Sequence, residues 1–385
     1  MSSDNRSARV VFLIRSLGIG GAEAQLVHLA TGLEERGFAV TVMAMYPGGP
    51  LETELQTRNG FDYLMLGKRG RSDVFGFGAN LLKEVRRRRP AIVHGYMPFG
   101  NQLALVAGRM ARAKVVWGIR SSFVDFRHYD LSDRLLFGTG RILSRLPDLM
   151  IINSWAGREH HERAGYQPSK MVVIPNGIDS ARFGPDPVAK RRARMQWGIP
   201  EDAPLVGIVG RLEPMKGHTT FLEAAGIVAS RSDAHFVCIG DGAPAYRREM
   251  EAKAIAEGCR DRIHWLGVCN DMPSAYAALD ILVSASVGEG FSNVIGEAMA
   301  SGVRCVVTDV GDSARIVGTA GIVVPPADPS AMARALLDLI EGNCESLSDP
   351  REHVSRNFSR ERMIAATASA LRSLVDTAAN PHPGL

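Results

Sequence analysis

Residues 281–302 read ILVSASVGEGFSNVIGEAMASG and contain one complete unit of alternating secondary structure. The run ILVSAS (281–286) is a continuous apolar stretch, typical of a strand that is buried on both faces of a parallel sheet. A glycine-bearing loop follows it. Ser292 and Asn293 are residue types favoured at helix N-termini and Gly302 is a helix-ending type, so VIGEAMA is predicted to be a helix. The stretch is therefore expected to be a strand–loop–helix unit of an α/β fold.

Two carboxylates, Glu289 and Glu297, flank this predicted helix start. The free N–H groups of a helix N-terminus bind anions such as phosphate. Because Cα–Cβ bonds in a helix tilt toward its N-terminus, Glu297 is directed back toward the loop that holds Glu289. Carboxylates are poor phosphate ligands but accept hydrogen bonds from sugar hydroxyls. The stretch is thus predicted to hold a phosphate at its centre and a hydroxylated ring at each end, rather than to carry plain surface charge.

The same alternation extends along the chain. Runs rich in Val, Ile and Leu are expected to be strands at 9–15, 39–45, 62–67, 91–96, 114–120, 149–154, 171–177, 205–211, 235–242, 263–268, 281–286, 305–310 and 321–326. Helical segments between them imply βαβ units and parallel sheets. Two further helical stretches are expected at Pro329–Glu341 and Arg351–Asp376.

At 385 residues the chain is too long for one ordinary hydrophobic core. The alternation of strands and helices restarts after the proline-bearing stretch 178–204, so the domain boundary is expected there. We predict two tandem Rossmann-like domains, residues 1–184 and 185–359, with a cleft between the carboxyl ends of their sheets.

The composition is that of a soluble globular protein, with 45% hydrophobic and 22% charged residues. No run approaches the ~20 apolar residues of a membrane-spanning helix. The polar N-terminus leads into the first predicted strand, so a secretory signal is not expected. The five cysteines are scattered without a CxxC pair, which favours reduced thiols, no zinc site and a cytoplasmic location.

Charge is distributed unevenly along the chain. Residues 1–184 carry 25 Lys and Arg against 16 Asp and Glu, whereas residues 185–385 carry 20 against 25. This asymmetry predicts an anionic partner for the first half. Its densest cluster, Arg86–Arg89, fits either a solvated helix C-terminus, where cations suit the macrodipole, or contact with anionic lipid headgroups. Nucleic acid is not expected, because the cluster lacks interleaved aromatic residues.

Two other segments follow predicted strands, at the sheet edge where open α/β folds bind ligands. In GRLEPMKG (210–217), Arg211 ends a strand and Lys216 follows it, and together these cations can neutralise a diphosphate. Gly20 and Gly21, after the first strand, fit either a loop that lines a cleft or a plain tight turn. The turn lacks the full GxGxxG spacing and no acidic residue ends the second strand, so a nicotinamide-linked oxidoreductase is disfavoured.

These motifs resemble those of GT-B glycosyltransferase family 4, the retaining nucleotide-sugar transferases. The resemblance covers nearly the whole chain, through GGAEAQ, VVIPNGID, GRLEPMKG, IGDG, EGFSNVIGEAMASG and TDVGDSARIVG in that order. It implies the GT-B fold, with a last helix at about residues 360–377 that returns to the first domain. It also implies transfer of a hexosyl or N-acetylhexosaminyl group from a nucleotide-diphosphate sugar to a saccharide or lipid-linked saccharide, in cell-surface polysaccharide or glycoconjugate biosynthesis.

The resemblance also assigns roles to particular residues. It implies that Arg211 and Lys216 bind the donor diphosphate, Glu297 the nucleotide ribose and Glu289 the transferred sugar. The donor site is completed by the backbone of Gly290, Phe291, Ser292, Asn293 and Val294, with Gly20 and Gly21 from the first domain.

The acceptor side is expected in the first domain. The family often carries an H-x-H pattern after the fourth strand, whereas this chain reads VHGYMPFGN, with His94 present and Tyr96 in the second position. His94 is therefore either a catalytic residue or a partly buried strand histidine. Tyr96, Arg120 and Ser121 are expected to line the acceptor side, together with the loops Gly70–Gly78 and Phe123–Arg134.

No two aspartates in the chain are separated by one residue, so the DxD metal–diphosphate motif is absent and no metal or other cofactor is expected. Lys216, Arg211 and the helix dipole would then stabilise the leaving group. The expected partners are a nucleotide sugar, a saccharide or polyprenyl-diphosphate-linked acceptor and an anionic membrane, at the cytoplasmic face of the inner membrane.

Two alternatives remain. A nucleotide-sugar epimerase of the same fold would need an acid–base set that is not evident beyond Glu289 and Glu297. A non-catalytic nucleotide-sugar-binding protein would be expected to lose Glu289, Lys216 or Arg211, and all three are present.

Overall fold

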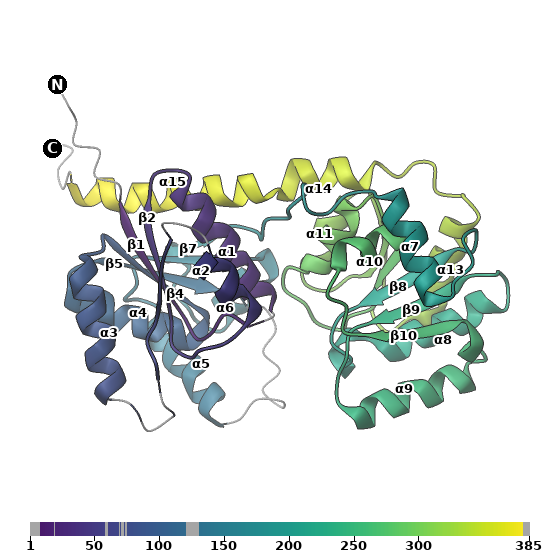
Figure 1. Cartoon of the computed structure of the whole chain (residues 1–385), viewed down its shortest axis with the longest axis horizontal. Helices are drawn as coiled ribbons and strands as arrows, with labels where there is room; N and C mark the ends of the chain where they lie inside the picture. The colour runs from purple at the N-terminus through teal and green to yellow at the C-terminus, as the bar shows by residue number, and fades with distance from the viewer. Residues whose placement is uncertain are drawn as a thin grey trace. The chain divides into compact units, whose positions relative to one another are not determined.

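The computed structural model describes residues 8–18, 20–57, 61–68, 70, 73, 75–120 and 131–379, without the side chains of 131–136 and 377–379. The chain divides into two compact units. Unit 1 comprises Met1–Gly177 and Arg360–Leu385, and unit 2 comprises Ile178–Ser359 (Figure 1). Each unit is a sheet covered by helices, and each is described by itself below.

Unit 1 is built on a seven-stranded parallel sheet with the order β3-β2-β1-β4-β5-β6-β7. Its strands are β1 (Arg9–Ile14), β2 (Ala39–Ala44), β3 (Asp62–Met65), β4 (Ile92–Tyr96), β5 (Lys114–Ile119), β6 (Leu149–Ile152) and β7 (Met171–Val173). Its helices are α1 (Gly21–Glu34), α2 (Pro50–Thr57), α3 (Phe75–Arg88), α4 (Met97–Ala111), α5 (Leu131–Leu143), α6 (Trp155–Arg163) and α15 (Arg360–Ala379).

Unit 2 is built on a six-stranded parallel sheet with the order β10-β9-β8-β11-β12-β13. Its strands are β8 (Leu205–Val209), β9 (His235–Ile239), β10 (Ile263–Gly267), β11 (Ile281–Ser284), β12 (Arg304–Thr308) and β13 (Ile322–Val324). Its α-helices are α7 (Pro187–Trp197), α8 (His218–Ala229), α9 (Pro244–Ala256), α10 (Met272–Ala278), α11 (Asn293–Ala300), α12 (Ser313–Val317), α13 (Pro329–Ile340) and α14 (Pro350–Phe358).

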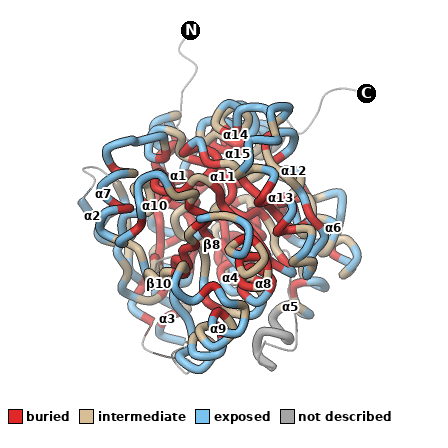
Figure 2. The backbone as a smooth tube through the Cα atoms, turned by 90° about the vertical axis from the view of Figure 1, so that its right-hand side faces the viewer, coloured by how far each residue is buried: buried red, intermediate tan, exposed pale blue. Residues whose placement is uncertain are grey.

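Every strand predicted from the apolar runs is present, and the two-domain α/β prediction is confirmed. The strands form where expected because helices cover both faces of each sheet, so a continuous Val/Ile/Leu run is buried throughout. All five residues of β4 and all four of β11 are buried. Buried stretches, red in Figure 2, lie inside and exposed stretches, pale blue, lie on the outer helices and loops.

The boundary between the units differs from the expected one. The sequence predicted a boundary within residues 178–204, with the domains divided at residue 184, whereas the structure assigns the chain from Ile178, the first residue of that stretch, to unit 2. Arg351 of α14 helps to hold this segment in unit 2, since its guanidinium donates to the carbonyls of Ser180 at 2.9 Å and Phe183 at 2.8 Å. The Phe183 ring also packs edge-on against Tyr276 of α10, with centroids 5.7 Å apart.

The helical stretch predicted at Arg351–Asp376 is two helices, α14 and α15, separated at Ser359. Ser359 is extended, with φ −66° and ψ 152°, and forms an isolated parallel bridge with Ile178. The chain re-enters unit 1 at this break. There α15 packs on α1, and Ile364 fills the space beside Gly32, where an added Cβ would lie 2.3 Å from its Cδ1. The last helix therefore belongs to unit 1, as the resemblance implied.

Among the described residues, none of the helices combines the length and the apolar character needed to cross a membrane.

Candidate functional site

The candidate site of unit 2 lies where its strand order reverses, between β8 and β11. At such a point the loops after the two strands leave the carboxyl edge in opposite directions and open a crevice for ligands. The loop after β8 contains the 3₁₀ turn Pro214–Lys216 and leads into α8, and the loop after β11 leads into α11. The backbone N–H of Val287 donates to the carbonyl of Met215 at 3.0 Å, which holds the two loops together.

Gly217 allows this close approach. Its φ is +70°, and a Cβ built on it would lie 1.9 Å from the carbonyl oxygen of Ala285. A side chain at this position would therefore push the two loops apart.

Lys216 and Glu289 form an ion pair across the two loops. Lys216 Nζ lies 2.6 Å from Glu289 Oε1, and Ser286 Oγ donates to the same oxygen at 2.8 Å. The side chains are only 20% and 12% exposed. Both line one small cavity, together with Ser292 and Val294 at the start of α11. The structure thus brings together the lysine and the glutamate that the sequence assigned to one site.

The start of α11 forms another wall of this cavity. Ser292 occupies the N-cap position as predicted, but its side chain makes no capping hydrogen bond. The Ser292 hydroxyl therefore accepts no hydrogen bond from the N–H groups of the first turn of α11. Such N–H groups at a helix N-terminus can bind an anion. Gly290 is anchored by the N–H of Asp312, which donates to its carbonyl at 3.0 Å, and Phe291 packs against Phe358. These two contacts fix the chain at Gly290 and Phe291, and the Phe291 side chain is buried.

Glu297 is held by a residue that the sequence did not single out. The hydroxyl of Tyr276, a buried residue of α10, donates to Glu297 Oε2 at 2.8 Å. Burial raises the pKa of Glu297, while the bond from Tyr276 and the nearby charge of Arg182 act in the opposite direction. Burial and the Glu297 carboxylate raise the pKa of Tyr276 well above its usual value, so its hydroxyl stays protonated and donates.

Arg211 does not join this cluster. Its side chain is 74% exposed, and its guanidinium pairs with Glu213 at 3.0 Å. The two cations expected to act together on a diphosphate are thus placed differently, with Lys216 in the cavity and Arg211 in solvent.

In unit 1 the strand order reverses between β1 and β4. Gly20 is the N-cap residue of α1 and Gly21 is its first residue. Gln25 fixes the start of this helix, because its buried side-chain amide exchanges hydrogen bonds of 2.8 and 3.0 Å with the backbone of Gly177. The motifs GGAEAQ and VVIPNGID are thus joined at one sheet edge.

The catalytic role predicted for His94 is not supported. His94 lies within β4 and is 0% exposed, with its ring 4.9 Å from that of Phe12. Neither ring nitrogen has a hydrogen-bond partner, and burial lowers the pKa of His94 well below its usual value, with a further contribution from Arg120. His94 is therefore a neutral core residue, the second of the two readings left open by the sequence.

Tyr96 and Arg120 lie together at the carboxyl edge of unit 1. Arg120 lies over the Tyr96 ring, with Cζ 4.5 Å from the centroid, and donates to the Tyr96 hydroxyl and, at 3.2 Å, to Asn176 Oδ1. Because Tyr96 is fully buried, it supports Arg120, which is partly exposed. Ser121, the loop Phe123–Arg134 up to residue 130, and residues 71, 72 and 74 of the loop Gly70–Gly78 lie outside the described residues.

Within the described ranges, no group of three or more His, Cys, Asp and Glu side chains is placed to hold a metal ion.

Comparisons with known proteins agree with this architecture. The model of Glycosyltransferase Family 4 matches residues 19–182, and that of Glycosyl transferases group 1 matches residues 203–342. The chain is 30% identical over 255 residues to the lipopolysaccharide core biosynthesis mannosyltransferase LpsB of Rhizobium meliloti (strain 1021), which covers 63% of this chain and 71% of that protein. It is 25% identical over 403 residues to a D-inositol 3-phosphate glycosyltransferase of Geodermatophilus obscurus, covering 95% and 88%.

Solved structures share the fold. Anabaena Alr3699/HepE in complex with UDP superposes with a TM-score of 0.82 at 22% identity, covering 95% of this chain and 100% of that one. WaaG, described as a glycosyltransferase involved in lipopolysaccharide biosynthesis, gives a TM-score of 0.63 at 18% identity, covering 98% and 100%.

The contact at Gly217 predicts a specific stability difference. Gly217 and Gly258 have nearly equal φ values, +70° and +71°, but a Cβ at Gly258 meets nothing within 4 Å. Gly217→Ala is expected to lower the free energy of unfolding by about 1–3 kcal/mol more than Gly258→Ala, because only the substitution at Gly217 forces the two loops apart. Gly217→Ala should therefore unfold at the lower temperature. Thermal unfolding of both variants checks this, and equal losses would show that backbone strain alone decides.

The bond from Tyr276 predicts a titration. We expect the pKa of Glu297 to lie above the ordinary value of 4.5, because its carboxyl group is buried. In Tyr276→Phe the pKa should rise further, because the hydrogen bond from the Tyr276 hydroxyl, which lowers it, is lost. Since the folded pKa is raised, protonation of Glu297 stabilises the fold below the unfolded pKa, and this contribution is lost as pH rises through the folded pKa. Carboxyl ¹³C NMR titration measures the value, with Glu297→Gln to identify the signal.

Tyr63→Phe is the matched control, since it removes a partly buried tyrosine hydroxyl from unit 1. It should leave the titration of Glu297 unchanged. A wild-type Glu297 pKa at or below 4.5 would contradict the description of this pair.

Proposed function

This chain belongs to glycosyltransferase family 4, and from that premise we propose that it moves a hexosyl or N-acetylhexosaminyl group from a nucleotide-diphosphate sugar to a saccharide acceptor, with retention of configuration and without a metal ion. The observation that carries the proposal is the Lys216–Glu289 ion pair beside the start of α11. It puts a cation, a helix N-terminus and a carboxylate that can accept a hydrogen bond from a sugar hydroxyl beside one cavity at the switch point of the sheet.

The donor would lie along this edge of unit 2. Its diphosphate would meet Lys216 Nζ and the first-turn N–H groups of α11, which together neutralise its charge. Glu289 would accept a hydrogen bond from the transferred sugar, and Glu297 from the ribose. Solved structures of Anabaena Alr3699/HepE with UDP and with UDP-glucose support a nucleotide-diphosphate sugar as the donor.

Arg211 would join the site when the donor arrives. Its exposed guanidinium is held by one partner, Glu213, at 3.0 Å. An exposed ion pair of this kind contributes little to stability, so a diphosphate can replace Glu213 at small cost. Arg211 would then offer its planar fork to the phosphate oxygens.

Stabilisation of the leaving nucleotide is the main catalytic task in this proposal. Charge would develop on the diphosphate as the bond to the sugar breaks. Lys216 and the dipole of α11 would stabilise this charge from fixed positions, and Arg211 would do so after its side chain moves in from solvent. The departing phosphate would take the proton of the acceptor hydroxyl, which permits attack on the face that the nucleotide leaves. The absence of a DxD motif supports a metal-independent reaction.

The acceptor would be a saccharide carried by a lipid, such as a polyprenyl diphosphate, in the assembly of a cell-surface polysaccharide. LpsB of Rhizobium meliloti, named for lipopolysaccharide core biosynthesis, supports this class. Arg120, braced by Tyr96 and Asn176, would line the acceptor side. The protein would then work peripherally at the cytoplasmic face of the inner membrane. An epimerase is less well supported, because no acid–base set is evident beyond Glu289 and Glu297, and His94 is buried.

The donor is tested directly. Purified protein is incubated with UDP-, GDP- and ADP-sugars, with and without lipid-linked saccharides, and nucleotide release is followed. We expect release that depends on one donor and one acceptor, with the anomeric configuration retained in the product by NMR. Interconversion of the donor without acceptor would favour an epimerase, and no turnover with any pair would favour a non-catalytic binding protein.

Lys216→Ala is expected to lower kcat/KM by about 100-fold or more, since removal of one preorganised group beside the developing charge typically costs that much. Steady-state kinetics with the identified donor measure the effect. Lys253→Ala is the matched control, because Lys253 is a cation of unit 2 paired with Glu223 and Glu257. Equal activity of the two variants would remove Lys216 from the mechanism.

A further inference from the structure

We infer that unit 1 docks on an anionic membrane leaflet through the C-terminal ends of α4 and α5, and not through the arginine run Arg86–Arg89. This docking surface consists of Val106, Met110, Ile142 and Leu146, with Arg109, Arg112, Lys114 and Arg145 around them. This inference rests on the proposed function, because docking on a membrane would bring the enzyme to its lipid-linked acceptor.

An apolar stripe runs along α4. Phe99, Leu103, Val106 and Met110 are spaced i, i+4, i+7 and i+11, which places them on one helix face. The opposite face, with Ala104 and Ala107, is buried against the sheet. Phe99 is 36% exposed, Val106 55% and Met110 46%, so the stripe faces solvent.

The end of α5 widens this stripe. Gln102 of α4 donates to Thr139 at 2.7 Å, and Arg109 donates to the carbonyl of Leu146. Both contacts join residues that are 37 positions apart, so the two segments run parallel and in register. The apolar residues of α5 and its C-terminal extension, Ile142 and Leu146, therefore lie level with the last turns of α4. They are 74% and 44% exposed.

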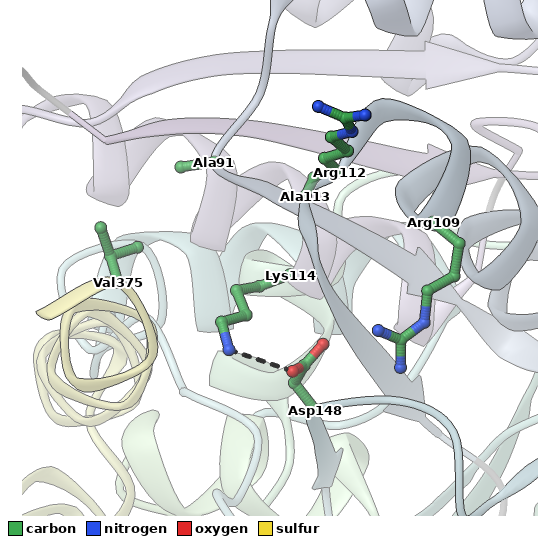
Figure 3. A pocket seen from close by; sticks show the side chains of 7 residues that line it. All are labelled: Ala91, Arg109, Arg112, Ala113, Lys114, Asp148 and Val375. Atoms are coloured by element: carbon green, nitrogen blue, oxygen red, sulfur yellow. Dashed lines mark hydrogen bonds and ion pairs between the residues drawn. The ribbon is translucent and has the colours of Figure 1, made fainter. Parts of the chain in front are cut away.

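A basic pocket adjoins the same helix ends. It has a volume of about 510 Å³ and is lined by Arg109, Arg112, Lys114 and Asp148, among others (Figure 3). Lys114 and Asp148 point toward one another and pair at 3.3 Å. One carboxylate thus opposes three cations, and the pocket keeps a positive charge suited to a phosphate-bearing headgroup.

The run Arg86–Arg89 differs, because carboxylates already engage part of it. Arg88 pairs with Asp62 at 2.8 Å and with Glu84 at 2.6 Å, and its side chain is 12% exposed. Arg87 also pairs with Glu84, at 3.1 Å. The bond from Arg88 holds the pKa of Asp62 below its usual value, so this partner stays charged. The densest basic cluster in the sequence is therefore partly neutralised in the fold.

The chemistry of the docking surface matches a bilayer interface. Exposed aliphatic and thioether side chains enter the boundary of headgroups and acyl chains, and a rim of arginines attracts anionic lipids. Either feature alone is weak, and here both occur at one pair of helix ends. Charge complementarity thus selects an anionic leaflet as the occupant.

The test is co-sedimentation of the full chain with vesicles of phosphatidylcholine, alone or with phosphatidylglycerol. We expect binding only to the anionic vesicles, weakened by salt. Arg112→Glu with Arg145→Glu is expected to reduce binding at least 10-fold, whereas the matched double reversal Arg86→Glu with Arg87→Glu changes it less than 3-fold. Equal losses in the two double variants would overturn the inference, since net charge alone would then explain binding.

An uncharged variant separates the apolar contribution. Met110→Ser with Ile142→Ser alters only exposed positions, and it is expected to reduce binding to anionic vesicles at least 5-fold with unchanged thermal unfolding. Absence of wild-type binding would overturn the inference. So would a concentration-dependent dimer, detected by light scattering and abolished by the same substitutions, because a second copy would then cover this surface.

Transfer to a water-soluble acceptor is measured in parallel, and these surface variants should retain it. If the wild-type protein transfers the sugar but does not bind the vesicles, the docking surface alone is refuted. Vesicle binding without transfer from any donor would refute the proposed function and leave the docking surface standing.

Discussion

The ion pair between Lys216 and Glu289 is the contact on which the site of unit 2 depends. It joins the loops after β8 and β11, the two strands between which the order of the sheet reverses. A pair this little exposed gains Coulomb energy but loses hydration, so its net contribution to stability is small. Its value is positional, because it fixes a cation and a carboxylate at the start of α11. Gly217 makes the pairing possible by letting the loops touch.

Much of the fold could be predicted because burial on both faces leaves a direct mark on composition. Each strand of a covered parallel sheet is a Val/Ile/Leu run, as in ILVSAS, and such runs are legible without knowledge of the neighbours. The helix α7 was missed within the stretch 178–204, whose prolines suggested a linker. The signals were present, since Asp186 caps the helix, Pro187 occupies its first turn and Gly198 ends it. Arg194 then anchors α7 to Asp280 at 2.6 Å.

The site was less predictable, because it depends on which side chains a fold places in contact. Lys216 and Glu289 were assigned to one site by motif, but their direct pairing follows from the strand order. The Tyr276–Glu297 bond leaves no mark in the sequence, since MPSAYAA reads as an ordinary apolar helix. His94 is the opposite case, because its place in a motif suggested a site residue. It is nevertheless buried, since it lies in a strand that is covered on both faces.

Strand polarity explains where part of the basic charge of unit 1 lies. In a parallel α/β layer each helix runs antiparallel to the strands, so its C-terminus lies at the amino edge of the sheet, where the negative end of the dipole favours cations. Arginines duly occupy the last turns of α3, α4, α5 and α6. Arg120, which we propose lines the acceptor side, lies instead at the carboxyl edge. A bilayer held at the amino edge by the ends of α4 and α5 would leave that opposite edge of unit 1 open to ligands. Strand polarity would thus place the membrane-docking surface and the acceptor side at opposite edges of the sheet of unit 1.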